Sequence, residues 1–508
     1  MRPRQRDHEM ANPDLRSKNG GTYRTPLQSK GALLRILAIV FALLGLFMLP
    51  SLVTAVVLKE FFMVRAFVIP LAAGLAAAFF AIILMPRQIF RLRIRDGFLL
   101  VFLTWILATL AGSVPFYLSP LNISFVDSVF ESACGFATTG ATTFRNVEAL
   151  PGSLLLWRSM SHWAGGMGII LLTVALLPLL GVGGFQLIKA EAPGPEKEKL
   201  TPRITEAAKI LWGVYCAFTV ILVLLYRLGG MGWFDAFCHG FTVISTGGVS
   251  TKNAGFAFYN SSFIDWVTVI FMLLGALNFN LYYRLVRGKF RDLAQNTEAR
   301  VFLFIFAAAA LLISLSLIPY YGSFTNALRF GSFQVASVLS TAGNARADYT
   351  AWPGLAQGVL FCLMFMGGCS GSTAGGVKII RITVLFKQAG NELRRVLYPR
   401  GVFSIRLNRK AGRKDVVYGV AGFVFLYFMI VAVTTLATAA AGFDIFSSFS
   451  AALSITGNIG AGFGAAGPGR NYSAFPDYLK LLYYLVMITG RLELWTVFVL
   501  FTPEYWRK

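Results

Sequence analysis

Long apolar stretches, separated by short polar segments, fill the chain from about residue 33 onward. Roughly ten of these stretches reach the 18 or so residues that a helix needs to cross a bilayer. The first two, at about 33–58 and 66–85, predict a helical hairpin with an external turn near Lys59 and Glu60. The pattern as a whole predicts an all-α integral membrane protein that crosses the membrane many times.

After the hairpin, one order of segments recurs four times. Each unit contains a spanning helix, a short apolar segment, a polar loop with glycine, and a second spanning helix. The short segments, of about 12–15 residues, cover only half of a bilayer, so we expect them to be re-entrant pore helices. We therefore predict four pseudo-symmetric helix–pore loop–helix repeats around one pore, at about 97–184, 206–290, 299–390 and 415–505.

The polar segments between these units indicate how the chain divides. We expect a basic cytoplasmic tail, then an N-terminal transmembrane hairpin with a basic loop, and then the four pore repeats. The tail is polar and carries Pro and Gly, which predicts disorder. The apolar run after it is too long for a signal-peptide core. The expected boundaries are 1–30, 31–96, 97–205, 206–298, 299–414 and 415–508.

A short stretch rich in Gly, Ser and Thr interrupts the apolar sequence of each repeat at membrane depth. Irregular backbone is tolerated there only where protein buries it or where it lines a watery pathway. Glycine permits the backbone angles of such a loop, and main-chain carbonyls can replace the hydration shell of a small cation. We predict that four loops meet as one selectivity filter, formed by Thr138-Thr139-Gly140, Ser245-Thr246-Gly247, Thr341-Ala342-Gly343 and Asn458-Ile459-Gly460.

The spacing of phenylalanines supports this alignment of the loops. Phe130, Phe237 and Phe333 each lie ten residues before the loop glycine, whereas the fourth repeat has Ser450 there. Four unrelated amphipathic hairpins are the alternative, but the recurring order of segments argues against it. The C-terminal end of a pore helix carries partial negative charge, which favours a cation where the helices converge.

The chemistry of the loops favours an alkali cation such as potassium or sodium. The loops offer neutral oxygen ligands, and they lack the cluster of His, Cys and carboxylate groups that holds a transition metal. Carboxylates near the starts of the pore helices would cap the helices or raise the local cation concentration. These carboxylates belong to Asp127, Glu131, Asp235 and Asp444.

The formal net charge of +23 changes the picture only through its location. Lys and Arg concentrate in segments that alternate with segments holding few of them. By the positive-inside rule the basic segments are cytoplasmic, which predicts that both chain termini lie inside. A nucleic-acid partner is not expected, because these residues belong to short loops that flank spans. The segments are 1–35, 86–96, 185–205, 284–300, 378–414 and 507–508.

Two stretches of sequence carry a resemblance to a known family. One is Trp157-Arg158-Ser159 through Trp163-Ala164-Gly165-Gly166-Met167-Gly168-Ile169. The more specific one is Gly367-Gly368-Cys369-Ser370-Gly371-Ser372-Thr373-Ala374-Gly375-Gly376-Val377-Lys378, followed by Arg381. With the four repeats, they make the chain resemble the TrkH family, the membrane subunits of bacterial potassium uptake systems. The resemblance covers roughly residues 33–505, and the N-terminal hairpin favours TrkH over its relative KtrB.

The resemblance implies that potassium is the substrate. Gly140, Gly247, Gly343 and Gly460 match the family's four filter glycines, and relatives with Ser at the first of these positions transport sodium. Asn344, directly after the third glycine, is polar, and no effect on selectivity is assigned to it. Potassium is expected at Thr139, Gly140, Thr246, Gly247, Ala342, Gly343, Ile459 and Gly460.

The family also implies a setting for this transport. The chain is expected to be no enzyme, to carry no cofactor, and to form a homodimer in the bacterial inner membrane with one pore per protomer. A cytosolic nucleotide-binding subunit of TrkA type would dock on the basic stretch 387–414. Channel-like conduction and proton-coupled symport both stay open.

Residues 367–376 match the family's intramembrane gating loop. Five glycines, two serines and a threonine in this stretch would unwind a helix. Close helix packing is the alternative, because Gly367, Gly371 and Gly375 also fit a small-residue ridge. The resemblance favours a gate formed by Gly367, Gly368, Cys369, Ser370, Gly371, Ser372, Thr373, Ala374, Gly375 and Gly376.

Arg491 is predicted to belong to the same gate. An arginine within an apolar run is costly unless it faces water or a partner. It matches the family's arginine beneath the filter, which implies an electrostatic barrier that couples to the gating loop. Pairing with backbone carbonyls is the alternative, and Glu493 is not expected to be the partner because it lies on a different helix face.

Other classes of function need other features. A proton-translocating or enzymatic subunit requires ionisable relays, metal ligands or a nucleophile in its spans, and very few ionisable residues occur there. His239, in the second pore helix, is expected to be packed and hydrogen-bonded. Two further alternatives are a sodium-conducting or non-selective transporter of the same fold, and a scaffold whose glycine loops merely pack. A measurement of cation flux would distinguish each of them from a potassium transporter.

Overall fold

The computed structural model describes residues 26–84, 94–171, 200–288, 290–408, 410–411 and 414–507. Within these residues the regular secondary structure is helical, as predicted, apart from a hairpin of two-residue strands, β1 Arg406–Leu407 and β2 Lys410–Ala411. Most of the predicted tail, 1–30, and most of the basic segment 185–205 lie outside the described residues.

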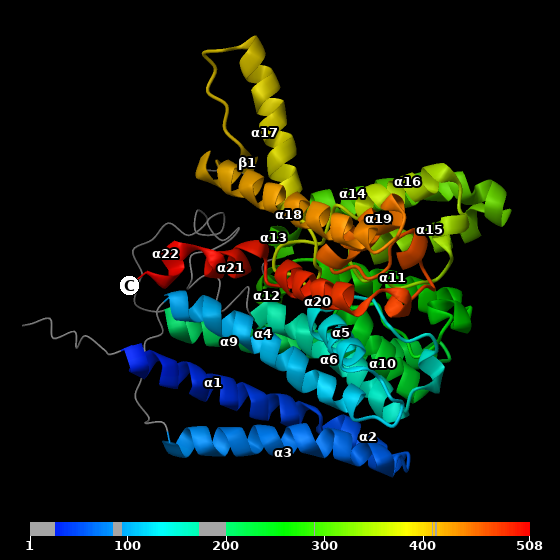
Figure 1. Cartoon of the computed structure of the whole chain (residues 1–508). Helices are drawn as coiled ribbons and strands as arrows, with labels where there is room; N and C mark the ends of the chain where they lie inside the picture. The colour runs from blue at the N-terminus through cyan, green and yellow to red at the C-terminus, as the bar shows by residue number, and fades with distance from the viewer. Residues whose placement is uncertain are drawn as a thin grey trace, which may run out of the picture.

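The N-terminal hairpin has its turn at Lys59 and Glu60, as predicted, and its two long helices lie side by side (Figure 1). Pro50 in the first turn of α2 lacks an N–H, so the first arm is divided into two helices at this point. The second arm begins at Phe61, earlier than expected. The elements are α1 Pro26–Phe47, α2 Leu49–Val57 and α3 Phe61–Leu84.

Four groups of helices follow, each in the order long helix, pore helix, loop and helix. The first contains α4 Ile94–Tyr117, α5 Phe125–Ala137 and α6 Gly152–Leu171. The second contains α9 Leu200–Leu228, α10 Trp233–Ile244, α11 Ser262–Ala276 and α12 Phe279–Val286. The third contains α14 Thr297–Tyr321, α15 Phe324–Leu339, α16 Gly354–Leu363 and α17 Ile379–Leu397. The fourth contains α18 Lys414–Ala440, α19 Ile445–Thr456, α20 Asp477–Arg491 and α21 Leu494–Phe498.

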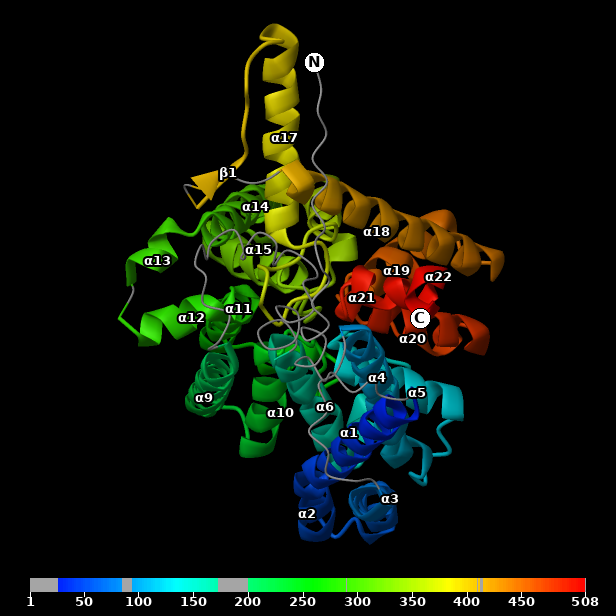
Figure 2. The same cartoon turned by 90° about the vertical axis from the view of Figure 1, so that its left-hand side faces the viewer.

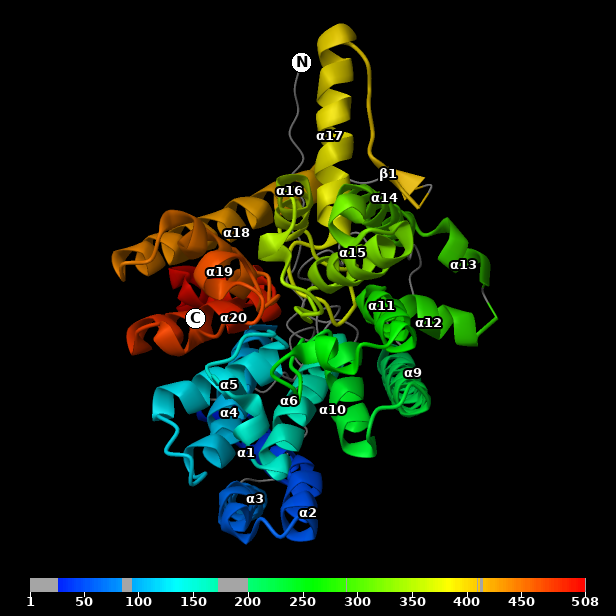
Figure 3. The same cartoon turned by 90° about the vertical axis from the view of Figure 1, so that its right-hand side faces the viewer.

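These four groups surround a common centre (Figures 2 and 3). The short helices α13 Phe290–Gln295 and α22 Pro503–Trp506 follow the second and fourth groups. Single 3-10 turns, at η2 Val147–Ala149, η4 Gly255–Tyr259, η5 Tyr349–Ala351, η6 Gly464–Ala466, η7 Tyr472–Ala474 and η8 Val499–Phe501, complete the helical elements. The arrangement brings four pore helices, α5, α10, α15 and α19, from distant parts of the sequence to the centre of the molecule.

Fewer helices run unbroken across a bilayer than the roughly ten expected. The described residues contain six helices that are long and apolar enough, or up to eight if two bent pairs each count as one span. The bent pairs are α11 with α12, at 91°, and α20 with α21, at 113°. One reason for the difference is that the helix after the pore loop is broken in the second, third and fourth groups, where polar and glycine-rich sequence interrupts the apolar pattern. In the first group the described residues end with α6 at Leu171.

Three of the four carboxylates predicted near the pore-helix starts lie there. Asp444 caps α19 by accepting a hydrogen bond from the N–H of Ser447 at 2.9 Å. Asp127 and Asp235 lie in the first turns of α5 and α10, and each forms an ion pair with a lysine, Lys480 at 2.7 Å and Lys252 at 3.3 Å. Pairing with lysine offsets the attraction that these two carboxylates exert on cations near the starts of the pore helices.

Candidate functional site

Each pore helix ends in the same backbone turn. The residue at the end of the turn has a left-handed conformation, with φ near +55° in all four loops. The next residue then donates its N–H to the carbonyl five residues earlier in the pore helix. These bonds are Thr139 to Cys134 at 2.8 Å, Gly247 to Thr242 at 2.7 Å, Ala342 to Ser337 at 2.8 Å, and Ile459 to Ser454 at 2.8 Å.

This repeated turn corrects the alignment of the second loop. The left-handed residues are Thr138, Thr246, Thr341 and Asn458. Two positions later the four loops carry Gly140, Gly248, Gly343 and Gly460. The prediction of Gly247 as the second filter glycine is therefore wrong by one residue, and Gly248 occupies that position.

The spacing of phenylalanines was misleading in the second repeat. Phe130 and Phe333 are fully buried, whereas Phe237 is 45% exposed and the neighbouring Cys238 is buried. Cys238, and not Phe237, lies ten residues before Gly248. The sequence alignment matched Phe237 to Phe130 and Phe333 because all three are aromatic. The backbone of α10, however, places Phe237 on the outer face of the helix.

Gly247 needs to be glycine for a different reason. A Cβ at this position would lie 2.2 Å from Nδ1 of His162 on α6. The second loop thus carries two adjacent glycines with separate tasks, because Gly247 makes room for the imidazole and Gly248 has a φ of +80° at the centre.

Carbonyl groups from different repeats converge at the centre of the molecule. A Cβ placed on Gly140 would lie 3.1 Å from the oxygen of Ile459, 3.2 Å from that of Gly247 and 3.3 Å from that of Ala342. A Cβ on Gly248 would lie 1.9 Å from the Ala342 oxygen, and one on Gly343 would lie 2.0 Å from the Ile459 oxygen. The loops therefore meet so closely that Gly248, Gly343 and Gly460 leave no room for a Cβ and Gly140 leaves little. Their neutral oxygens form a set of ligands suited to a hard monovalent cation.

Side chains of the pore helices hold the chain that returns from the centre. The carboxylate of Glu131 accepts from the N–H of Thr143 at 2.6 Å, Gln334 Oε1 accepts from the N–H of Arg346 at 3.2 Å, and Ser450 Oγ accepts from the N–H of Phe463 at 2.6 Å. His239 is buried and hydrogen-bonded, as predicted, to the Asp235 carbonyl and the Ser250 hydroxyl. Glu131 is mid-helix and buried, so its prediction as a cap at the helix start is wrong.

Asn344, which follows the third glycine, is buried. Its backbone carbonyl accepts a hydrogen bond from Ser337 Oγ at 2.8 Å, and its side-chain amide lies 3.4 Å from Met272 Sδ. In the fourth loop Ser454 Oγ bonds the carbonyl of Ala461 at 3.1 Å in the same way. The pore helix therefore holds the residue after the glycine through its main chain, which explains why a polar side chain is tolerated there.

The predicted gating loop lies between α16 and α17 and is not helical. α16 ends at Leu363 and α17 begins at Ile379. Inside this gap the Gly367 N–H bonds the Val377 carbonyl at 2.8 Å, so the segment folds back on itself. A helix-packing ridge over Gly367, Gly371 and Gly375 requires continuous helix, and the structure excludes it.

The predicted gating loop contacts the predicted filter loops directly. The Gly375 N–H donates to Thr341 Oγ1 at 2.7 Å, and a Cβ on Gly375 would lie 2.4 Å from the Gly457 carbonyl oxygen. Thr373 Oγ1 accepts from Thr246 Oγ1 at 3.3 Å and donates to the carbonyl of Gly275 at 2.9 Å. The stretch predicted as a gate therefore lies against the ends of three pore helices.

Arg491 is the last residue of α20 and is 2% exposed. Its Nη1 donates to the carbonyl of Thr373 in the gating loop at 2.5 Å, and its Nη2 donates to the carbonyl of Gly165 on α6 at 3.0 Å. Pairing with backbone carbonyls, the predicted alternative, is thus observed, and one of those carbonyls belongs to the gating loop. Glu493 instead forms an ion pair with Arg381, whose guanidinium lies 3.7 Å from the centre of the Phe423 ring.

Sequence reasoning missed one residue of this region. Glu298, in the first turn of α14, is buried, and its Oε1 accepts from the N–H groups of Ser370 at 2.7 Å and Ile380 at 3.2 Å. A single carboxylate oxygen thereby joins the predicted gating loop, at Ser370, to the first turn of α17, at Ile380. In the sequence an acidic residue in a first helical turn is ordinary, so no signal distinguished it.

Comparison with known proteins places these features in a family. Residues 72–508 match the TrkH family, described as cation transport protein. The Trk system potassium uptake protein TrkH of Halomonas elongata is 38% identical over 486 residues, which cover 94% of this chain and 99% of that protein. The protein of the same name from Escherichia coli K12 is 39% identical over 422 residues, or 82% of this chain and 87% of that one.

A solved structure agrees with these sequence matches. The crystal structure of the potassium transporter TrkH from Vibrio parahaemolyticus matches with a TM-score of 0.85 at 34% identity, over 95% of this chain and 100% of that one. With its apolar spanning helices, the chain is a multi-pass membrane protein of a transporter family and not an enzyme. On the shared sequence, the shared fold and the four converging loops, the chain belongs to the TrkH family of cation transport proteins.

Proposed function

We propose that this chain is the membrane-spanning, potassium-translocating subunit of a bacterial Trk-type potassium uptake system. The observation that carries the proposal is the convergence of the Gly247, Ala342 and Ile459 carbonyls on Gly140. Uncharged oxygens from four quarters of one chain can replace water around a monovalent cation. The relatives are known as potassium uptake proteins, which supports potassium as that cation.

With the register corrected, we propose two adjacent layers of main-chain ligands for potassium. One layer contains the carbonyls of Thr139, Gly247, Ala342 and Ile459, and the other those of Gly140, Gly248, Gly343 and Gly460. Thr138, Thr246, Thr341 and Asn458 lie one position nearer the pore helices. Asn458 supports the first layer, because its Nδ2 donates to Thr139 Oγ1 at 3.0 Å and to the Met487 carbonyl at 3.0 Å.

We propose that residues 367–376 close the pore beneath this filter and that Arg491 holds them there. Its guanidinium bonds the gating loop and α6 at the same time. A buried positive charge at this point repels a cation that leaves the filter. Opening the pore would require the loop to exchange its hydrogen bonds to Arg491, Thr341 and Glu298 for others.

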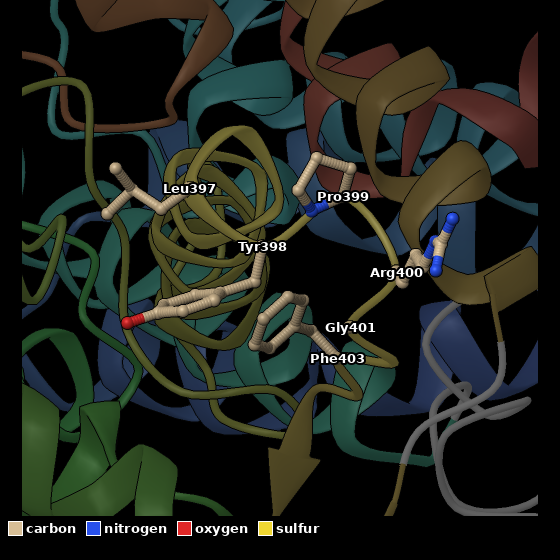
Figure 4. A pocket seen from close by; sticks show the side chains of 6 residues that line it. All are labelled: Leu397, Tyr398, Pro399, Arg400, Gly401 and Phe403. Carbon is tan, nitrogen blue, oxygen red and sulfur yellow. The ribbon is translucent and has the colours of Figure 1, made fainter.

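We further propose an inner-membrane location with both termini in the cytoplasm, a homodimer, and a cytosolic regulatory subunit of TrkA type. The positive-inside distribution of Lys and Arg supports the orientation. Helix α17 stands away from the body of the molecule (Figure 1), and Phe386, Leu393 and Val396 on it are exposed, which supports an apolar contact with a second copy. Its tip, where the rings of Tyr398 and Phe403 lie near each other and Arg400 points away from them (Figure 4), is a candidate contact for the regulatory subunit.

Uptake of rubidium by the purified protein in liposomes, with potassium and sodium as competitors, tests the proposed function. We expect uptake that potassium inhibits and sodium inhibits poorly. In the same assay Gly140→Ser should weaken the preference for potassium while the protein still folds. Equal inhibition by both ions in the unchanged protein would favour a non-selective or sodium-conducting transporter, and absence of flux would favour a packing scaffold.

A further inference from the structure

The pore helix α5 carries one buried carboxylate behind the filter. Glu131 is 1% exposed. Its Oε1 accepts from Thr142 Oγ1 at 2.6 Å and from the Thr143 N–H at 2.6 Å, with Thr143 Oγ1 at 3.2 Å. Thr142 lies two residues after Gly140. Glu131 therefore holds the first loop directly beyond its filter glycine.

The partner of this carboxylate comes from the next helix of the same repeat. Arg158 on α6 is 3% exposed, and its Nε lies 3.1 Å from Glu131 Oε2. Its Nη1 donates to the carbonyl of Ser250 at 3.4 Å. Ser250 lies two residues after Gly248, the position that Thr142 has in the first loop. The Glu131–Arg158 pair thus joins equivalent points of two filter loops.

The pore helices of the third and fourth repeats perform the matching task with uncharged side chains, whereas in the second repeat the carboxylate of Asp235 also accepts from Thr251 Oγ1 at 2.7 Å. Gln334 and Ser450 each accept one backbone N–H of the returning chain, and His239 bonds the Ser250 hydroxyl. Burying two charges costs desolvation energy, and a buried ion pair is often no more stabilising than neutral residues of similar volume. Folding alone therefore does not explain an ion pair at this place.

We propose that Glu131 and Arg158 are positioning residues for ion selection, which set the spacing between the first and second filter loops and balance each other's charge beside the pore. The proposal rests on the proposed function, because it assigns a role within the same filter. Selectivity of a carbonyl filter depends on the separation and field of its oxygens. Loss of either partner frees a loop and also leaves an uncompensated charge near the transported cation.

Rubidium uptake by the full-length protein in liposomes, with potassium or sodium as competitor, tests this role in Glu131→Gln and Arg158→Gln. We expect the preference for potassium over sodium to fall about tenfold in both variants, the size typical for groups that orient ion ligands. The KM should rise in Glu131→Gln, which leaves a positive charge, and should fall in Arg158→Gln, which leaves a negative one. The double variant should return KM toward the wild-type value.

Lys480→Gln is the matched control. It breaks an ion pair with Asp127 on the same pore helix, at 2.7 Å, and Lys480 has no hydrogen bond to a filter loop in the described residues. Its ion preference should equal that of the wild type. The proposal would be overturned, and the proposed function left intact, by an unchanged preference for potassium in both Glu131→Gln and Arg158→Gln. KM values that change in the same direction in these two variants would also overturn it. No selective uptake by the wild type would instead overturn the proposed function.

Variants on the loop side keep the test decisive if Glu131 or Arg158 proves necessary for folding. Thr142→Val and Thr143→Val remove hydroxyls that bond Glu131 but leave the ion pair in place. We expect each to lower the preference for potassium by about threefold, less than loss of the carboxylate, because the Thr143 N–H bond remains. If both preserve the wild-type preference, the carboxylate does not position the filter.

Discussion

The backbone N–H of Gly375 in the gating loop donates a hydrogen bond to Thr341 Oγ1 in the third filter loop, at 2.7 Å. Thr341 precedes Ala342, whose carbonyl is one of those that converge on Gly140. The proposed filter and the proposed gate are therefore joined by a direct hydrogen bond. A change in the gating loop can reach the filter through one hydroxyl, without movement of a whole helix.

Thr341→Val should loosen the gate. The substitution keeps the shape of the side chain but leaves the buried Gly375 N–H without its acceptor, at a cost of about 1–3 kcal/mol to the closed arrangement. We expect rubidium uptake without the regulatory subunit to rise roughly tenfold, which corresponds to 1.4 kcal/mol. Thr138→Val is the matched control, since this residue has the same backbone position and its hydroxyl has no partner among the described residues. Equal uptake by the two variants would contradict the link.

Alanine substitutions in the second loop separate the two adjacent glycines. Gly247→Ala should impair folding or uptake through a clash with His162, so a second change, His162→Ala, should restore both. Gly248→Ala should abolish selective uptake, because its Cβ would lie 1.9 Å from the Ala342 oxygen and its φ of +80° disfavours a side chain. His162→Ala should not rescue it. The amount of folded protein and the uptake of rubidium are the measurements, and the reverse pattern of rescue would restore Gly247 as the filter glycine.

Arg491→Ala should raise cation flux without abolishing assembly. It removes both a buried positive charge and two hydrogen bonds that join the gating loop to α6. Arg491→Lys distinguishes these effects, because lysine keeps the charge but cannot reproduce the two hydrogen bonds that the planar guanidinium donates. If the charge is the barrier, the lysine variant should keep a low flux in liposomes; if the contact is the barrier, both variants should conduct. Unchanged flux in both, with normal expression, would count against any role in gating.

Glu298 should contribute to the stability of the gating loop. Glu298→Ala leaves the N–H groups of Ser370 and Ile380 without their acceptor and should lower the free energy of unfolding by about 2–5 kcal/mol. Glu298→Gln retains a carbonyl oxygen at the same place and should lower it by less. Thermal unfolding of the detergent-solubilised protein measures the difference. Equal destabilisation by both changes would show that the charge, and not the oxygen, holds the loop.

Local sequence was sufficient to predict the all-helical architecture, the hairpin and the presence of the four loops, but not the bends between α11 and α12 and between α20 and α21. Apolar length and glycine-rich interruptions act within one segment, so their effects can be read without the rest of the chain. For the same reason the break at 367–376 was predicted, and the costly position of Arg491 was noticed.

Tertiary structure decided the remaining features, because each depends on contacts between residues far apart in the sequence. From the sequence, either of two adjacent glycines could be the filter glycine of the second loop. In the fold, Ala342 lies against Gly248 and His162 lies against Gly247, so the two glycines have different roles. The sequence likewise left open which carbonyls satisfy Arg491 and that Glu131 turns toward a loop and not toward solvent. A buried hydrogen-bonding group must be paired, but only the folded chain determines which partner is within reach.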